Sequence, residues 1–319
     1  MHSNKRLSIG VMLPTHAPRR VPLDPQFTVH SAVWAEEHGF DAVWTGDHIV
    51  HPWQFLESLT TLTFVAARTR TITVGTCVLL LPMRQLIVTA AQIATLATLS
   101  NGRFRLGVGI GGEWPREWQA AGVPIKERGP RLDEALPLIR RLFTGETIDF
   151  SGRFHEFVGV GLSPPPPPIP IYLAGRAPAA LARSGQLADG WLGFFLTPRG
   201  FQRDGEVINS AREHAGRSDR PFERGMLLNF HIGENDESAL ETALALNLGF
   251  AEEIQLAAST EQLKLFALAG TPTTVLARLQ EYVDAGCTTF CLSPMQKEKT
   301  AYQAQLDIFT TEVLPKLRS

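Results

Sequence analysis

The stretch Arg103-Phe104-Arg105-Leu106-Gly107-Val108-Gly109-Ile110-Gly111-Gly112-Glu113 is typical of a short buried strand that runs directly into glycines and then into a carboxylate. Glycines at the carboxyl end of a strand let the backbone approach a flat or phosphorylated ligand, because no Cβ intervenes. Two further strands are predicted to end similarly, one in Thr45-Gly46-Asp47-His48 and the other in Leu173-Ala174-Gly175-Arg176. We therefore expect these strand ends to share one mouth.

Short apolar runs alternate with helix-like segments along the whole chain. The predicted strands cover 7–14, 41–48, 71–80, 103–111, 169–176, 190–196, 226–232 and 288–293. Strands of this kind, apolar on both faces and separated by helices, pair in parallel. A (β/α)8 TIM barrel fits this pattern and the length of 319 residues, and a doubly wound sheet is the alternative. We expect a single domain over 1–319 with insertions after strands 4 and 7, at 112–168 and 249–270.

The composition narrows the class of protein. Hydrophobic residues make up 44% of the chain and charged residues 19%, as in a well-cored globular protein, and the net charge of -2 argues against a nucleic-acid partner. No apolar run approaches the roughly 18 residues that span a bilayer, and the start lacks a signal-peptide core. The three cysteines provide no disulfide framework. We expect a cytoplasmic protein without a membrane partner.

Gly107-Val108-Gly109-Ile110-Gly111-Gly112 matches the dinucleotide-binding pattern G-x-G-x-x-G. That pattern should open a helix in the first βαβ unit, with an acid about twenty residues further on at a strand end. Here Glu113-Trp114-Pro115 follows, which we take to be poor helix sequence, and Asp133 lies inside a helical pattern. The sequence thus favours a ligand-binding turn or a purely structural one over a Rossmann fold.

Several polar residues at the predicted strand ends are candidates for chemistry. Asp47 and His48 put a carboxylate beside an imidazole, which can bind a ring and exchange a proton near neutral pH, or simply form an exposed turn. Gly175 and Arg176 precede a helix, where backbone N–H groups and a guanidinium can hold a phosphate. No third ligand joins His48 and His51, so we expect no metal. The candidates for a substrate pocket, on loops after strands, are His16, His51, Trp53, Trp114 and Trp118.

Taken together, these motifs resemble the luciferase-like monooxygenase superfamily, and within it the branch that uses coenzyme F420. The resemblance runs nearly end to end, over 10–14, 35–41, 43–48, 72–76, 106–111, 131–136, 171–175 and 188–191. It implies a TIM barrel that binds the cofactor at the carboxyl ends of its strands.

The resemblance also implies roles for individual residues. Asp47 matches an acid that contacts the cofactor ring, and His48 a neighbouring proton donor. Cys77-Val78 matches a non-prolyl cis peptide that supports the ring. The remaining matches are backbone contacts to the ring at Ile110 and Gly111, and phosphate contacts at Ala174, Gly175 and Arg176.

Glu113 is the second candidate catalytic residue, although Gly112 separates it from the position of a glutamate in the F420 sugar-phosphate dehydrogenases. That offset, and the lack of a recognisable cationic cluster, argue against a sugar-phosphate substrate. We expect hydride transfer between F420 and a small organic substrate. The alternatives are an FMN-dependent monooxygenase that uses O2 and a separate flavin reductase, a degenerate cofactor-binding protein, and a non-redox (β/α)8 enzyme. The resemblance further suggests a homodimer.

Overall fold

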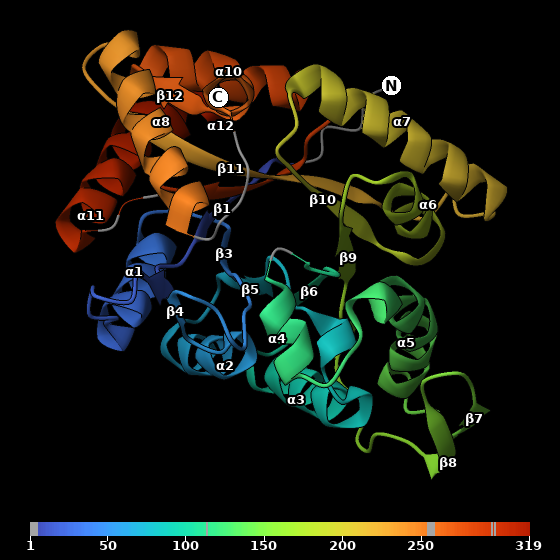
Figure 1. Cartoon of the computed structure of the whole chain (residues 1–319). Helices are drawn as coiled ribbons and strands as arrows, with labels where there is room; N and C mark the ends of the chain where they lie inside the picture. Colours follow the sequence, from blue (N-terminus) through green and yellow to red (C-terminus); the bar gives the residue numbers. More distant parts are fainter. Residues whose placement is uncertain (1–5, 113, 254–258, 295, 297) are drawn as a thin grey trace.

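Parallel strands close into a barrel in this computed structural model, which describes residues 6–112, 114–253, 259–294, 296 and 298–319 (Figure 1). The order around the barrel is β1-β3-β5-β6-β9-β10-β11-β13, and β13 pairs in parallel with β1. The bounds are β1 Ser8–Met12, β3 Ala42–Thr45, β5 Thr73–Thr76, β6 Phe104–Val108, β9 Ile171–Ala174, β10 Gly190–Phe194, β11 Glu223–Ile232 and β13 Thr289–Ser293. The predicted TIM barrel is confirmed, with the strands in the predicted order.

Helices connect consecutive strands and surround the barrel (Figure 1). They are α1 Pro25–Glu37, α2 Ser58–Arg68, α3 Leu86–Leu99, α5 Arg128–Phe143, α6 Pro178–Leu187, α7 Pro198–His214 and α10 Pro272–Asp284, followed after β13 by α11 Lys299–Ile308 and α12 Leu314–Arg318. Local chemistry explains their ends. In α1 the side chain of Asp24 accepts hydrogen bonds from the N–H groups of Gln26 and Phe27, and Gly39 follows the helix with a φ of 81°.

Extra elements lie in the two longest connections between strands. Between β6 and β9, α4 Pro115–Ala120 precedes α5, and the hairpin of β7 Ile148–Ser151 and β8 Glu156–Val160 projects beyond α5 (Figure 1). Between β11 and β13 lie α8 Asp236–Glu253, α9 Thr260–Phe266 and β12 Leu268–Gly270. The interpretation of Trp114-Pro115 as poor helix sequence is wrong, because Pro115 occupies the first turn of α4, where its missing N–H is not needed.

The inside of the barrel is filled by a few large rings packed against glycines. Trp44 on β3 is 2% exposed and lies between β1 and β5. A Cβ on Gly10 or on Gly75 would lie 2.4 Å from an atom of the Trp44 ring, so both positions must lack a side chain. The barrel is therefore a packed core, and ligands can bind only at its ends.

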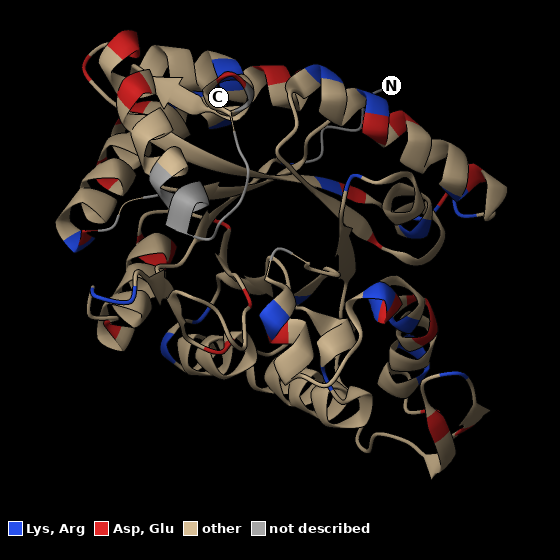
Figure 2. Cartoon of the chain, in the orientation of Figure 1, with Lys and Arg blue, Asp and Glu red and all other residues tan. Residues whose placement is uncertain are grey.

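Charged residues lie mostly on the outer helices and loops and rarely on the strands (Figure 2). Within the described residues, none of the helices combines the length and the apolar character needed to cross a membrane.

Candidate functional site at the barrel mouth

The carboxyl ends of the barrel strands bring the predicted site residues to one rim. Asp47 and His48 follow β3, Cys77 and Val78 follow β5, and Ile110 and Gly111 follow β6. Ala174, Gly175 and Arg176 lie at the end of β9 and directly after it. Because all the barrel strands are parallel, these ends open at the same face. The expected convergence of distant segments at one mouth is therefore found.

The peptide bond between Cys77 and Val78 is cis, as the resemblance implied. The N–H of Cys77 donates to the carbonyl of Thr45 on β3 (2.7 Å), and the N–H of Leu79 donates to the carbonyl of Gly107 on β6 (2.8 Å). A Cβ on Gly109 would lie 2.4 Å from Cγ2 of Val78. The segment Cys77-Val78, which we call the bulge, is thus held from both neighbouring strands. Gly109 lets it approach β6.

Asp47 is buried, and its carboxylate oxygens accept hydrogen bonds from protein groups. Oδ1 accepts from Ser58 Oγ (2.9 Å) and from Arg84 Nη2 (2.6 Å), and Oδ2 accepts from the N–H of Leu80 (2.9 Å). Arg84 also pairs with Glu57 at 3.0 Å. In this arrangement Asp47 fixes the segment that follows the cis peptide. The predicted contact of Asp47 with a cofactor ring stays a prediction.

His48 is held by a carboxylate that was not among the predicted site residues. Glu117 on α4 is 1% exposed, and its Oε2 lies 2.9 Å from His48 Nδ1, while Oε1 accepts from the N–H groups of Ile49 and Val50. Burial opposes ionisation of Glu117, but these hydrogen bonds outweigh it and lower the pKa of Glu117 below its usual value. An ionised Glu117 keeps a proton on Nδ1, so Nε2 is the ring nitrogen left free to exchange one.

Histidines and aromatic rings gather around His48. Its ring centroid lies 4.3 Å from that of His51 and 4.8 Å from that of Phe55, and His16 stacks on Trp53 at 5.6 Å. These loops are joined because β2 His16–Ala17 pairs with β4 Gln54–Phe55. Burial is the main cause that lowers the pKa of His16 and of His51 to about 4, and the nearby charge of His48 adds to the shift. Both histidines are therefore neutral at pH 7.

Two of the predicted tryptophans differ in their surroundings. The ring of Trp114 lies 6.2 Å from that of His51, so it belongs to the cluster around His48. Trp118 is 1% exposed and is buried in a small apolar cluster with Leu80 and Met83. Its expected place in a substrate pocket is therefore wrong, and it supports the segment after β5 instead.

The segment after β9 carries the glycine and the arginine that were predicted to contact a phosphate. Gly175 has a φ of 134°, and α6 begins at Pro178 without a side-chain cap on its N-terminus. Arg176 is exposed, donates to the carbonyl of Phe195 (3.2 Å), and lies with Cζ 5.8 Å from the centre of the Phe194 ring. A helix N-terminus without a side-chain cap and a guanidinium are both groups that bind phosphate esters, so the predicted phosphate contact stays a prediction.

The glycine turn after β6 takes conformations that favour glycine. Gly111 has a φ of 49° and Gly112 a φ of 128°. A Cβ on Gly112 would lie 3.4 Å from Nε of Arg128, so the guanidinium of Arg128 borders this turn. Glu113, the second predicted catalytic residue, lies outside the described residues.

The comparisons with known proteins agree on one family. The model of luciferase-like monooxygenases matches residues 7–289. The F420-dependent glucose-6-phosphate dehydrogenase of Kineococcus radiotolerans is 31% identical over 90% of this chain and 91% of its own length. The enzyme of the same description from Amycolatopsis mediterranei is 29% identical over 92% of this chain and 95% of its own length.

Solved structures agree in fold. An F420-dependent secondary alcohol dehydrogenase in complex with an F420–acetone adduct superposes with a TM-score of 0.86 at 22% identity, over 98% of this chain and 100% of that one. The FMN-bound oxygenating constituent of 3,6-diketocamphane monooxygenase from Pseudomonas putida superposes with a TM-score of 0.75 at 17% identity, over 98% and 99%. At these identities the structures support the barrel fold alone.

Proposed function

Because this chain belongs to the luciferase-like monooxygenase family, we propose that it is an F420-dependent oxidoreductase that exchanges a hydride with a small organic substrate. The observation that carries the proposal is the pairing of His48 with buried Glu117 on the same rim as the cis peptide at Cys77-Val78. The rim thus holds a group that can move a proton beside a support for a flat ring. Relatives of matching length that are named as F420-dependent dehydrogenases support the choice of cofactor.

The residues at the mouth fit such a cofactor. The uncapped N-terminus of α6 and Arg176 would hold its phosphate, together with Ala174 and Gly175. The apolar bulge of Cys77 and Val78 would support the ring, with backbone contacts from Ile110 and Gly111. Asp47 would act mainly by holding the bulge in place through the N–H of Leu80.

His48 would move the proton that accompanies hydride transfer. Its Nδ1 is engaged by Glu117 and its side chain keeps 19% exposure, so Nε2 would be the ring nitrogen that meets a bound molecule. When bound, the cofactor would accept the hydride from the substrate or donate it to the substrate. In substrate reduction His48 gives a proton to the substrate oxygen, and in oxidation it takes one.

The rings around His48 and the residue Glu113 would complete the catalytic site. His16, His51, Trp53 and Trp114 would line the substrate side of the mouth, since their rings surround His48. Glu113 would contribute as a second catalytic group. We place the protein in the cytoplasm as one domain over 1–319 that forms a homodimer.

Titration of the purified protein with F420 and, separately, with FMN tests the choice of cofactor. We expect F420 to bind more tightly, seen as a change in its violet absorbance band, and Arg176→Ala to weaken that binding. Preferential binding of FMN would favour the oxygen-using monooxygenase instead. Binding of F420 with no turnover of any alcohol or ketone would indicate a degenerate cofactor-binding protein. If neither cofactor binds, the proposed redox function is wrong.

His48→Gln tests the proton-transfer role. We expect this variant to bind F420 as the parent does, while turnover falls by about 10²–10⁴-fold, the usual range for the loss of a general acid. Unchanged turnover would rule out His48 as the donor.

A further inference from the structure

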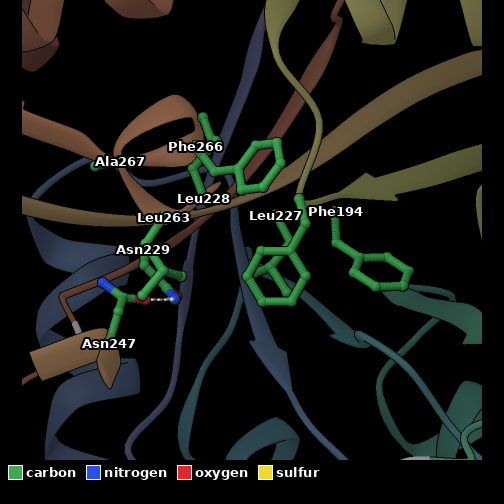
Figure 3. A pocket seen from close by; sticks show the side chains of 9 residues that line it. Phe194, Leu227, Leu228, Asn229, Asn247, Leu263, Phe266 and Ala267 are labelled. Carbon is green, nitrogen blue, oxygen red and sulfur yellow. Dashed lines mark hydrogen bonds between the residues drawn. The ribbon is translucent and has the colours of Figure 1, made fainter. Parts of the chain in front are cut away.

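A pocket lies where β10 ends beside the middle of β11, and residues of α8 and α9 contribute to its lining (Figure 3). Apolar side chains form most of its wall, with two amides among them. The lining residues are Phe194, Phe195, Leu227, Leu228, Asn229, Asn247, Leu263, Phe266 and Ala267. We call this the β10–β11 pocket.

The polar atoms of the β10–β11 pocket are uncharged. Asn229 Nδ2 donates to Asn247 Oδ1 (3.0 Å), and Asn247 Nδ2 donates to the carbonyl of Ala243 (2.7 Å), which orients both amides (Figure 3). No described residue donates a hydrogen bond to Asn229 Oδ1. The pocket therefore offers a hydrogen-bond acceptor but, among the described residues, no cation.

A second hollow lies against the same helix, since Leu246 of α8 lines that hollow and Asn247 lines the β10–β11 pocket. The other residues around this hollow are Met12, Leu13, Pro14, His16, Pro18, Trp53, Ser293, Gln296 and Tyr302. His16 is neutral at pH 7, because burial and the charge of His48 lower its pKa to about 4. The described walls of both hollows thus carry no formal charge.

The strand order places the β10–β11 pocket across the mouth from the cis peptide. In the closed order β1-β3-β5-β6-β9-β10-β11-β13, β11 is four strands from β5 in either direction. Leu227 packs against the buried cluster inside the barrel that includes Cys77, and Asn229 lies two residues further along β11 on the same face. A molecule between the bulge and β11 would meet apolar side chains on the β11 side.

From this geometry, and resting on the proposed function, we infer that the substrate is an uncharged secondary alcohol or ketone whose apolar substituent occupies the β10–β11 pocket. In the oxidation direction, the C–H bond of the alcohol carbon breaks and its electron pair passes with the hydrogen to the deazaflavin. The hydroxyl proton passes to Nε2 of His48, and the C=O bond forms. The alcohol is oxidised and the deazaflavin reduced, and ketone reduction is the reverse.

The same walls disfavour a phosphorylated substrate. A phosphate dianion that leaves water needs cations or several N–H donors, and an unpaired buried charge is strongly unfavourable. Arg176 contacts Phe194 and the carbonyl of Phe195 next to the pocket, but it belongs to the proposed cofactor phosphate site. We therefore expect the chain to differ in substrate class from its glucose-6-phosphate-oxidising relatives.

Calorimetric titration of the F420-loaded protein tests the inference by binding as well as by turnover. The probes are cyclohexanone, 4-tert-butylcyclohexanone and glucose 6-phosphate. We expect both ketones to bind more tightly than the sugar phosphate. Tighter binding or faster oxidation of glucose 6-phosphate would overturn the inference while leaving the F420-dependent function intact. Failure of F420 itself to bind, seen in the preceding absorbance titration, would instead reject the proposed function.

Phe266→Ala, with Leu265→Ala as the matched control, tests whether the apolar substituent of the substrate binds in the β10–β11 pocket. Phe266 lines the pocket, whereas Leu265 on the same helix is 54% exposed and does not. Removal of the phenyl group should raise the affinity for 4-tert-butylcyclohexanone relative to cyclohexanone by about tenfold, the usual effect of a small change in an apolar pocket. Leu265→Ala should leave the ratio unchanged. An unchanged ratio in Phe266→Ala would place the substituent elsewhere.

Discussion

Replacement of Glu117 by Gln removes the charge, but not the bulk, of the buried side chain that holds His48. The carboxylate receives hydrogen bonds from the backbone N–H groups of Ile49 and Val50 at one oxygen and faces His48 Nδ1 with the other. The Gln oxygen can keep the two backbone donors, which turns its NH2 group toward Nδ1. Nδ1 must then accept a hydrogen bond, and the ring cannot hold its second proton without placing two donors face to face.

The size of the effect follows from the lost contact. A hydrogen bond to a charged group contributes about 1.5–3 kcal/mol, and each 1.4 kcal/mol in the barrier changes a rate about tenfold. If the charged ring is needed only when the proton moves, Glu117→Gln should lower kcat by about 10- to 100-fold. Binding of F420 should stay nearly unchanged, because Glu117 is 1% exposed and directed at His48.

Turnover is measured by the absorbance of F420 with saturating alcohol, and cofactor binding by titration of the same preparation. Glu134→Gln is a matched control, because Glu134 also faces a histidine Nδ1, that of His155, at 2.9 Å and accepts from backbone N–H groups of the 153–155 turn. Both variants should lose similar stability, about 1–3 kcal/mol. Equal kcat in the two variants, or a loss confined to cofactor affinity, would refute the reasoning about His48.

Three further outcomes are expected. Arg176→Ala should weaken F420 binding by about tenfold or more in a fluorescence titration, because one charged hydrogen bond is lost, whereas Arg199→Ala, at the exposed start of α7, should not. Gly75→Ala should lower the free energy of unfolding by about 1–3 kcal/mol in urea denaturation, since its Cβ would overlap the tryptophan ring inside the barrel. Stability should also rise between pH 4 and pH 6.5. His16 and His51 have a pKa of about 4 in the folded protein and the ordinary histidine pKa of 6.5 in the unfolded chain, so the unfolded chain binds more protons in that window. Replacement of both histidines by Gln should flatten this rise, and an unchanged slope would contradict the assignment.

Much of the barrel could be predicted because its determinants are local. Each strand is a short apolar run, and many helix ends carry their own capping residues, as at Asp24 and Gly39. The short strands β2 and β4 could not be predicted. Each has two residues, and they pair only because two loops meet. Their sequences carry no periodicity that distinguishes a strand from a loop.

The site could be predicted where it follows the strand ends and not where it depends on contacts between distant loops. His48 and Cys77-Val78 are strand-end residues, and the family resemblance indicated their importance. Glu117 lies 69 residues from His48 and Arg84 lies 37 residues from Asp47. Neither residue belongs to a repeating pattern, so only the folded chain reveals that the buried carboxylate and the guanidinium complete these pairs.

The packing of one indole against two glycines makes three positions on adjacent strands interdependent. Trp44 fills the space that side chains at positions 10 and 75 would otherwise occupy. A family member with a small residue at position 44 should therefore carry bulk at 10 or 75, and the three should covary while their summed volume stays nearly constant. The same exchange gives a route to redesign: shrinking the indole and enlarging a glycine together should be tolerated where either change alone is not.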